Sequence, residues 1–329
     1  MSNLKIAIIG VSHWHVPLYI KGLKEINANV IGVSDYNKDI ALNVALDLDT
    51  KTFTSPRELI EEEKPDLAFA FSPHNQMYIL ARQLIECKIP FSIEKPCGLN
   101  YQQVNELAEL AEQRGTYCTI PFIWRYSDAV NYFKNQNQMS YTHFSFRFVA
   151  GPPERYLQNN SPWMLDKAQA GGGCMTNLGV HFIDIVSYLT GINDMQVLGA
   201  GYNYTYSYSV EDYAAALLKV GEHTTFSIET GYAFPMDEKH KRENTWTIVT
   251  NNAYHSLTDG QIESRFFDGK NNIKYLPTDS DEYYPVFVKE TIRQVENGEP
   301  SQIDLRQMAH VRKILDDINK TAEINRIKS

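Results

Sequence analysis

Apolar and polar positions follow two alternating patterns in the first third of the chain. Short runs of consecutive apolar residues are typical of parallel strands that are covered on both faces. Between these runs, apolar residues recur every three or four positions, which predicts amphipathic helices. Alternating units of this kind favour a doubly wound parallel sheet with right-handed crossovers. The expected strands are 4–9, 29–33, 66–71 and 89–93, and the expected helices are 13–26, 38–48, 74–87 and 101–114.

The pattern changes after Phe122. Thr142, Phe144, Phe146 and Phe148 occupy every second position, which predicts a half-solvated antiparallel strand at 141–149. After it come a loop rich in Pro, Gly and Asn, one helix, several strands and two final helices. We therefore expect an N-terminal α/β domain and a C-terminal α+β domain with a mostly antiparallel open sheet. The expected domains are 1–122 and 123–302, with a last helix in 303–329 that packs back on the first domain.

The turn after the first strand has one glycine of a dinucleotide-binding fingerprint. The fingerprint Gly-x-Gly-x-x-Gly lets the backbone approach a pyrophosphate at the start of a helix. Gly10 stands first, Ser12 second and His15 third. Serine is small and can donate to a phosphate, whereas His15 departs from the pattern. We expect Gly10, Ser12 and His13 to bind the cofactor at the positive end of the helix.

Asp35 ends the second strand near the position of the fingerprint's acid. A carboxylate there can bind the ribose hydroxyls and would repel a 2′-phosphate, so NAD is favoured over NADP. The alternative is a solvated aspartate in a turn.

Composition excludes several classes of protein. With 31 Lys and Arg against 40 Asp and Glu, the formal net charge is −9, which disfavours binding to nucleic acid or to an anionic membrane surface. No apolar run approaches the length that spans a bilayer. The four cysteines have no disulfide-like or zinc-like spacing, and no metal is expected although His13 and His15 flank Trp14. We expect a cytoplasmic protein.

Two later motifs place reactive groups at predicted element ends. Glu94-Lys95-Pro96 ends the fourth strand, and a lysine at the carboxyl edge of a parallel strand points into the crevice where ligands bind. The glycines 171–173 precede a predicted helix at 175–189. On it, Asn177, His181 and Asp184 are spaced four and three residues apart, so they form one polar stripe.

With the turn Ser72-Pro73, these motifs resemble the glucose–fructose oxidoreductase / inositol dehydrogenase family (Gfo/Idh/MocA) over essentially the whole chain. The resemblance implies a Rossmann-type domain that binds NAD(P). It also implies hydride transfer between the nicotinamide and a sugar, polyol or related hydroxy compound. The residues it places at the cofactor are Ser72, Pro73, His74, Glu94 and Lys95.

The resemblance further implies catalytic roles. His181 would take the hydroxyl proton while Lys95 holds the same oxygen, and Asp184 would bind another hydroxyl. The family usually has Asp where this chain has Asn177. We expect Asn177 to accept a hydrogen bond from the His181 imidazole but to stabilise its charged form less. Asn177→Asp is therefore expected to shift the pH–rate profile.

Other residues have two interpretations. Arg125 either binds substrate or supports the seam between the domains. The loop 151–173, which contains Arg155 and Trp163, is expected to cover the active site, and Trp163 either stacks on a sugar or fills the core. Two further functions stay open: an NAD-dependent glycoside hydrolase that acts by transient oxidation, and a non-catalytic NAD-binding regulator.

Tyrosines alternate at one place in the second domain. Tyr202, Tyr204, Tyr206 and Tyr208 would all face the same side of one strand. A row of tyrosines on an open sheet face suits a partner surface. We expect a homodimer or homotetramer assembled through the C-terminal sheet, as the family resemblance also implies.

Overall fold

The first domain is built on a six-stranded parallel sheet, as the alternating pattern predicts. The computed structural model describes residues 3–135, 139–235, 241–277 and 279–328. The strand order β3-β2-β1-β4-β5-β6 reverses direction beside β1, which leaves a crevice at the carboxyl ends of β1 and β4. The strands are β1 (Ile6–Ile9), β2 (Val30–Ser34), β3 (Lys51–Phe53), β4 (Leu67–Ala70), β5 (Phe91–Ile93) and β6 (Cys118–Thr119).

Helices connect these strands and begin at residues that suit helix starts. Asn37, Ser55 and Asn100 each accept a hydrogen bond from the backbone N–H three residues on. The short elements β3, α3 and β6 were not expected from the sequence, because runs of two to eight residues give little periodicity. The helices are α1 (Val16–Glu25), α2 (Lys38–Leu48), α3 (Pro56–Glu63), α4 (His74–Glu86) and α5 (Tyr101–Arg114).

The second domain is an eight-stranded sheet in which β7 and β10 pair in parallel and the other neighbours are antiparallel. Its order is β14-β13-β12-β11-β7-β10-β9-β8. As predicted, Phe144, Phe146 and Phe148 are buried on one face of β7. The strands are β7 (Tyr141–Ala150), β8 (Met195–Asn203), β9 (Tyr213–Val220), β10 (Thr224–Gly231), β11 (Arg242–Thr250), β12 (Ala253–Thr258), β13 (Gln261–Phe266) and β14 (Asn271–Tyr275).

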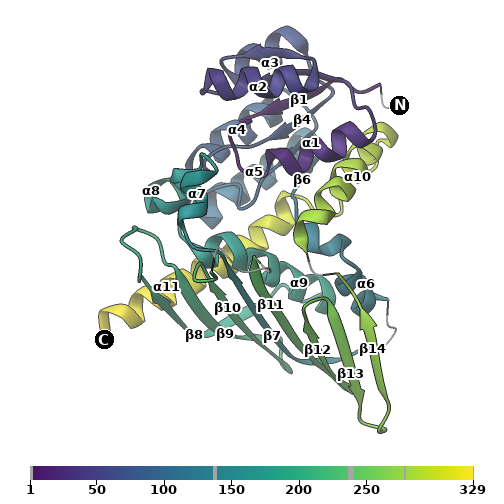
Figure 1. The fold of residues 1–329 in the computed structure, drawn as a ribbon, viewed down its shortest axis with the longest axis vertical. Helices are drawn as coiled ribbons and strands as arrows, with labels where there is room; N and C mark the ends of the chain where they lie inside the picture. The colour runs from purple at the N-terminus through teal and green to yellow at the C-terminus, as the bar shows by residue number, and fades with distance from the viewer. Residues whose placement is uncertain (1–2, 136–138, 236–240, 278, 329) are drawn as a thin grey trace.

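Helices cover one face of this sheet and lie between it and the first domain, while no labelled helix covers the opposite face (Figure 1). The helix expected at 175–189 is a π-helical turn, Met175–Gly179, followed by α9 (Val180–Thr190). The remaining helices are α6 (Asp128–Lys134), α7 (Glu154–Gln158), α8 (Lys167–Ala170), α10 (Tyr284–Asn297) and α11 (Leu305–Lys328), with 3₁₀ turns at Ile123–Tyr126, Pro162–Leu165 and Ser280–Tyr283.

The two C-terminal helices tie the domains together. Helix α10 packs against α1, and α11 packs against both α5 of the first domain and β8 of the second. The buried Arg312 of α11 donates to the carbonyl oxygens of Gly98 and Leu99 and pairs with Asp316. The end of the chain therefore contacts the first domain, and it also covers one end of the second sheet.

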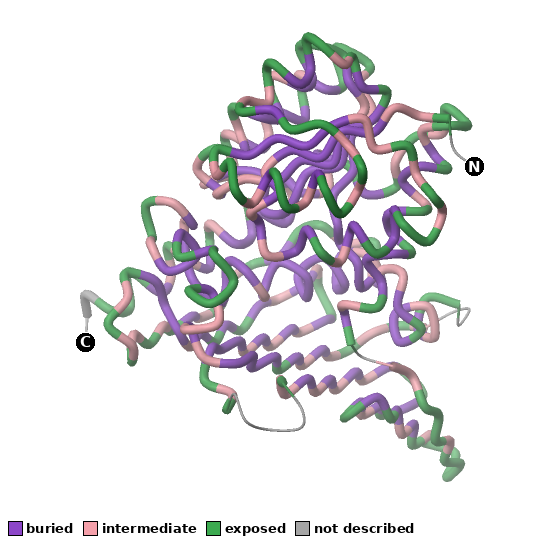
Figure 2. The backbone as a smooth tube through the Cα atoms, turned by 45° about the horizontal axis from the view of Figure 1, so that its top comes forward, coloured by how far each residue is buried: buried purple, intermediate pink, exposed green. Residues whose placement is uncertain are grey.

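Burial differs between the two sheets (Figure 2). Strands β1, β4, β5 and β6 of the first sheet are buried throughout, whereas β9 and β10 of the second sheet largely alternate between buried and accessible residues. The expected row of tyrosines is wrong. Tyr202 lies on β8 and donates to Asn319 Oδ1 of α11 at 2.5 Å, and Tyr204, Tyr206 and Tyr208 follow the end of that strand.

Candidate active site

The turn between β1 and α1 brings backbone to the carboxyl edge of the parallel sheet. Gly10 has φ +81°, and its N–H donates to Ser34 O at 2.7 Å. An ideal Cβ at Gly10 would lie 2.0 Å from the carbonyl oxygen of Phe71. Only glycine fits this position, so the one glycine kept from the fingerprint is the one that the turn requires.

A cleft of about 390 Å³ opens beside this turn. The carboxylate of Asp35 lies at its edge, where Oδ2 accepts from the Ser12 N–H at 2.7 Å and Oδ1 from the Asn37 N–H at 2.8 Å. Its walls include Gly10, Ser12, His13, Asp35, Ser72, Pro73, Ile79, Leu80 and Trp163. Glycine backbone, small hydroxyl donors, one acid and apolar side walls are the surroundings that a dinucleotide needs, so these residues fit NAD.

A second cavity, of about 460 Å³, lies where the two domains meet. Trp14, His15 and Lys95 reach it from the first domain, and Asn177 and His181 reach it from the second. Ser12 and His13 line the cleft, whereas the next two residues of the same turn line this cavity. A single turn thus borders both spaces.

Lys95 is the buried cation of the second cavity. It follows β5, and the Lys95–Pro96 peptide is cis. Its Nζ donates to the backbone oxygen of Asn177 at 2.8 Å and to Asn177 Oδ1 at 2.6 Å. Burial lowers the pKa of Lys95 to about 8, Glu94 opposes this shift and Arg155 adds to it. An ammonium has three N–H donors, so one is left for a ligand.

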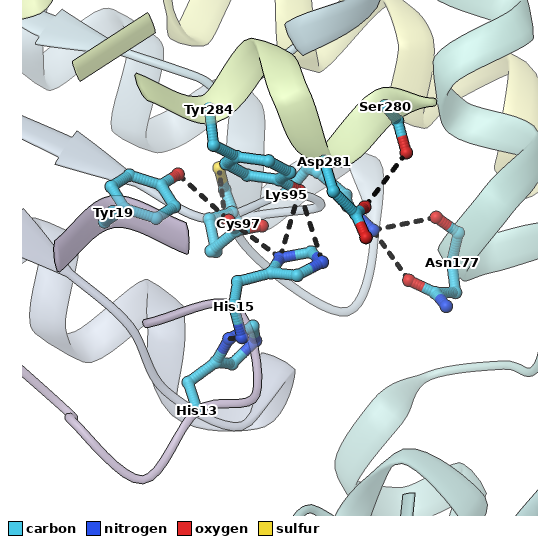
Figure 3. Close-up of polar contacts among 10 residues, drawn as sticks. His13, His15, Tyr19, Lys95, Cys97, Asn177, Ser280, Asp281 and Tyr284 are labelled. Carbon is cyan, nitrogen blue, oxygen red and sulfur yellow. Dashed lines mark hydrogen bonds and ion pairs between the residues drawn. The ribbon is translucent and has the colours of Figure 1, made fainter. Parts of the chain in front are cut away.

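The expected pairing of Asn177 with His181 is wrong. Asn177 Oδ1 accepts from Lys95, and its Nδ2 donates to the Tyr156 hydroxyl at 2.7 Å (Figure 3 shows Asn177 facing Lys95). His181 Nδ1 is buried without a hydrogen-bond partner in the described residues. Burial, followed by Lys95 and His15, lowers the pKa of His181 well below 6.5. His181 is therefore a neutral imidazole beside the cavity at pH 7.

A buried carboxylate pairs instead with a histidine of the glycine turn. His15 Nδ1 lies 3.0 Å from Glu94 Oε1, and the Tyr19 hydroxyl donates to the same oxygen at 3.0 Å. The Tyr284 hydroxyl lies 3.2 Å from both ring nitrogens of His15, and Figure 3 shows the two rings close together. Burial is the main reason that the pKa of His15 is well below 6.5. This group orients His15 at the cavity, and it explains why histidine stands at the third fingerprint position.

Other predicted site residues lie away from the second cavity. The carboxylate of Asp184 accepts from Arg125 Nε at 2.8 Å and from Nη2 at 2.5 Å, and neither residue lines either cavity. Arg125 also donates to Gln302 O, which favours its interpretation as a residue of the domain seam.

Trp163 lines the cofactor cleft. His74 is buried beside it and donates from Nδ1 to Ala170 O at 2.7 Å.

Several residues of the second cavity were not selected from the sequence. Arg155, Arg242, Asp281 and Tyr284 line it together with His15. They come from α7, β11, the turn before α10 and α10 itself, so no local spacing joins them. Two signals were available: the loop 151–173, which contains Arg155 and was expected to cover the active site, and the pair His13 and His15 in the glycine turn, where His15 departs from the fingerprint.

No group of three or more His, Cys, Asp or Glu in the described part of the chain is placed to hold a metal ion. Among the residues in that same part, no helix is both long and apolar enough to cross a membrane.

Comparison with protein families matches both domains. Residues 4–122 match the model described as "Oxidoreductase family, NAD-binding Rossmann fold", and residues 140–254 match the GFO/IDH/MocA C-terminal domain. The chain is 22% identical over 225 residues to the rhizopine catabolism protein MocA of Rhizobium meliloti, covering 66% of this chain and 64% of the relative. It is 24% identical over 204 residues to UDP-N-acetylglucosamine 3-dehydrogenase of Acidithiobacillus ferrooxidans, covering 61% and 59%.

These matches span less than two thirds of either relative's length. A solved structure covers more of the chain. GenD2 from gentamicin A biosynthesis, in complex with NAD, has a TM-score of 0.84 at 15% identity and covers 99% of this chain and 95% of its own. At that identity the likeness shows a shared fold.

Proposed function

This chain belongs to the Gfo/Idh/MocA family of NAD-binding oxidoreductases, and from that premise we propose that it oxidises a hydroxyl-bearing carbon of a sugar, polyol or related compound. The observation that supports this reaction is the meeting of Lys95 and His181 at one cavity, beside the cleft that fits NAD. The curated relative that acts on a UDP-sugar at its 3-position is consistent with a carbohydrate-like substrate.

NAD would be held along the carboxyl edge of the parallel sheet. Gly10 and Ser12 would face its phosphates, and Asp35 would face the ribose hydroxyls of its adenosine half. Ser72, Pro73 and His13 also line the cleft and would border the bound cofactor. Bound NAD supplies the acceptor for the hydride.

The chain's own residues would manage the proton and the substrate oxygen. Lys95 would donate its remaining N–H to the reacting oxygen and stabilise the negative charge that develops there. His181, which is neutral at pH 7, would accept the hydroxyl proton. Glu94 would act only indirectly, by holding the His15 ring through its carboxylate, because Glu94 itself lines neither cavity. Asn177 would position Lys95 through two hydrogen bonds.

One experiment tests the reaction. The protein is incubated with NAD and a panel of sugars, polyols and their aryl glycosides, and NADH absorbance and aglycone release are followed together. Net NADH supports a dehydrogenase. Aglycone release without NADH would instead indicate a hydrolase, and tight NAD binding with neither product would indicate a regulator.

We also propose that the chain forms a homo-oligomer through the open face of the second sheet. Leu217, Tyr254, Ile273 and Tyr275 are exposed on this face, and strand register places them on the same side. Acidic and basic side chains are mixed there, for example the pair Arg147 and Glu229, so a second copy can be charge-complementary. Light scattering at micromolar concentration tests the proposal, and a monomer would refute it.

A cytoplasmic location is proposed on the state of the cysteines. All four are free, although one is exposed and three are buried. Free thiols suit a reducing compartment. Fractionation of cells that express the intact gene tests this, and recovery of the chain outside the cytoplasm would contradict it.

A further inference from the structure

The second cavity has an excess of positive charge. Four cations line it, Lys95, Arg155, Lys241 and Arg242, against one acid, Asp281. Arg242 pairs with Asp281, with Nη2 and Oδ2 3.1 Å apart. The buried Glu94 is next to Lys95 in the sequence, and its charge opposes the lowering of the Lys95 pKa by burial. Glu94 therefore offsets the positive charge of Lys95. Among the described residues that line the cavity, Lys241 and Arg155 are left without an acid, and of these Lys241 is exposed while Arg155 is half-buried.

Arg155 is held in place by aromatic rings rather than by a carboxylate. Its guanidinium carbon lies 4.6 Å from the centre of the Tyr156 ring and 5.3 Å from that of Tyr232. Its Nη2 donates to the Tyr156 hydroxyl at 2.6 Å, and its Nε is buried without a hydrogen-bond partner in the described part of the chain. An unpaired buried donor of a charged group is costly, so an anion from outside would be bound well here.

Arg155 is linked to Lys95 by neutral groups. The Tyr156 hydroxyl accepts from Arg155 Nη2 and from Asn177 Nδ2, and Asn177 Oδ1 accepts from Lys95 Nζ. The guanidinium and the ammonium therefore border one cavity with only a phenol and an amide between them. Because residue 177 is an amide, the link between Arg155 and Lys95 contains no acid that could cancel the charge of Arg155.

We propose that Arg155 binds an anionic group of the substrate, so that the substrate class is a hydroxy compound with a carboxylate or a phosphate. This proposal rests on the dehydrogenase function proposed above. A planar guanidinium fits both anions through paired N–H donors, and such charge-assisted bonds are stronger than neutral ones. A neutral polyol would leave the Arg155 charge in the cavity without compensation.

Matched substrate pairs test the proposal. NADH formation is measured for D-gluconate against D-sorbitol, and for D-glucose 6-phosphate against D-glucose. We expect kcat/KM to be at least about 10-fold higher for the charged member of one pair. The pair with the larger ratio distinguishes a carboxylate from a phosphate.

Variants of Arg155 give the second measurement. Arg155→Gln keeps a polar side chain that can still donate to Tyr156, and is expected to lower kcat/KM for the charged member about 10- to 100-fold while changing the neutral member less than about threefold. Arg155→Lys should recover part of the loss. Arg114→Gln removes the same charge from the exposed end of α5 and should change neither member. An equal loss on both members would show that Arg155 only supports the fold, and would overturn the proposal.

Equilibrium binding separates this proposal from the dehydrogenase function. Trp14 and Trp124 line the cavity, so gluconate and glucose 6-phosphate are titrated by intrinsic fluorescence, with and without NADH. If either anion binds in an Arg155-dependent way but no compound yields NADH, the anion site stands and the dehydrogenase function fails. If neutral polyols yield NADH and neither anion binds, the function stands and the anion site is refuted.

Discussion

The two cavities of this protein are built in opposite ways. The cofactor cleft is bordered mainly by segments that follow the strands of the first sheet and by α4, and its polar side chains are almost all uncharged. The second cavity collects charged and aromatic side chains from both domains. Only Asp35 in the cleft has a charged side chain, whereas the second cavity has four cations.

The difference indicates how a fold of this kind can keep one ligand and change another. The position of Gly10 is set by the close approach of the Phe71 carbonyl, so the cleft depends on backbone geometry. The second cavity depends on side chains such as Arg155 that other segments hold in place. A substitution can alter these side chains without moving the sheet, so the substrate can change while the cofactor is kept.

The largest expected effect comes from the two groups that we propose to act at the reacting centre. Lys95→Met and, separately, His181→Gln should each lower kcat/KM at least about 10³-fold, because each removes a group proposed to act on the substrate oxygen or its proton. NAD affinity should change less than about fivefold, since neither residue lines the cleft. Steady-state kinetics and NAD titration measure the two quantities. A variant that keeps full activity would remove its residue from the mechanism.

A smaller effect is expected on cofactor choice. Asp35→Ser removes the carboxylate that would repel a 2′-phosphate, and serine can still accept from the Ser12 N–H. The ratio of kcat/KM for NAD to that for NADP should fall about 100-fold. Asp39→Asn removes the same charge from an exposed position on α2 and should leave the ratio unchanged. An unchanged ratio for Asp35→Ser would mean that Asp35 only supports the turn.

Asn177→Asp tests which residue the amide serves. Since Asn177 Oδ1 lies 2.6 Å from Lys95 Nζ, a carboxylate there should raise the pKa of Lys95 from about 8. The alkaline limb of the kcat/KM profile, where the ammonium loses its proton, should move to higher pH, and kcat/KM for an anionic substrate should fall about 10-fold. A shift of the acidic limb alone would restore the interpretation in which residue 177 acts on His181.

The last expected effect is on stability beside the cleft, not on catalysis. Burial lowers the pKa of His74 to about 3, so the folded state keeps His74 neutral while the unfolded state binds a proton below about pH 6.5. Stability is therefore lost as the pH falls from 6.5 towards 3, and His74 accounts for about 2 kcal/mol of the loss at pH 5. Urea unfolding at pH 7 and pH 5 should show a smaller loss for His74→Gln. His223→Gln, at an exposed position, should match the wild type.

Local rules predicted the first domain well and the contacts of the site poorly. The four strong apolar runs are β1, β2, β4 and β5, and their parallel order follows from the alternation with helices. The stripe of Asn177, His181 and Asp184 was derived from helical spacing, but each side chain has different surroundings. Lys95 and Tyr156 bind the first, the buried Nδ1 of the second has no hydrogen-bond partner among the described residues, and Arg125 binds the third.

The tyrosine row failed for a related reason. Alternation along a strand says which residues share a side, but not where the strand ends or what covers it. Here β8 ends at Asn203, and α11, from more than 100 residues later in the sequence, contacts Tyr202. Exposed apolar residues that strand register places on the open face include Leu217 of β9, Tyr254 of β12 and Tyr275 of β14.

The sequence by itself determined the strand–helix alternation, the glycine turn with its acid, the lysine at a strand end and the family. Each of these depends on spacing along the chain or on a backbone conformation that few residues adopt. The tertiary structure decided that His15 pairs with Glu94, that Asn177 serves Lys95 and that Arg155 faces the cavity without an acid. A buried polar group bonds only to a group brought within about 3 Å, and here packing of distant segments makes that choice.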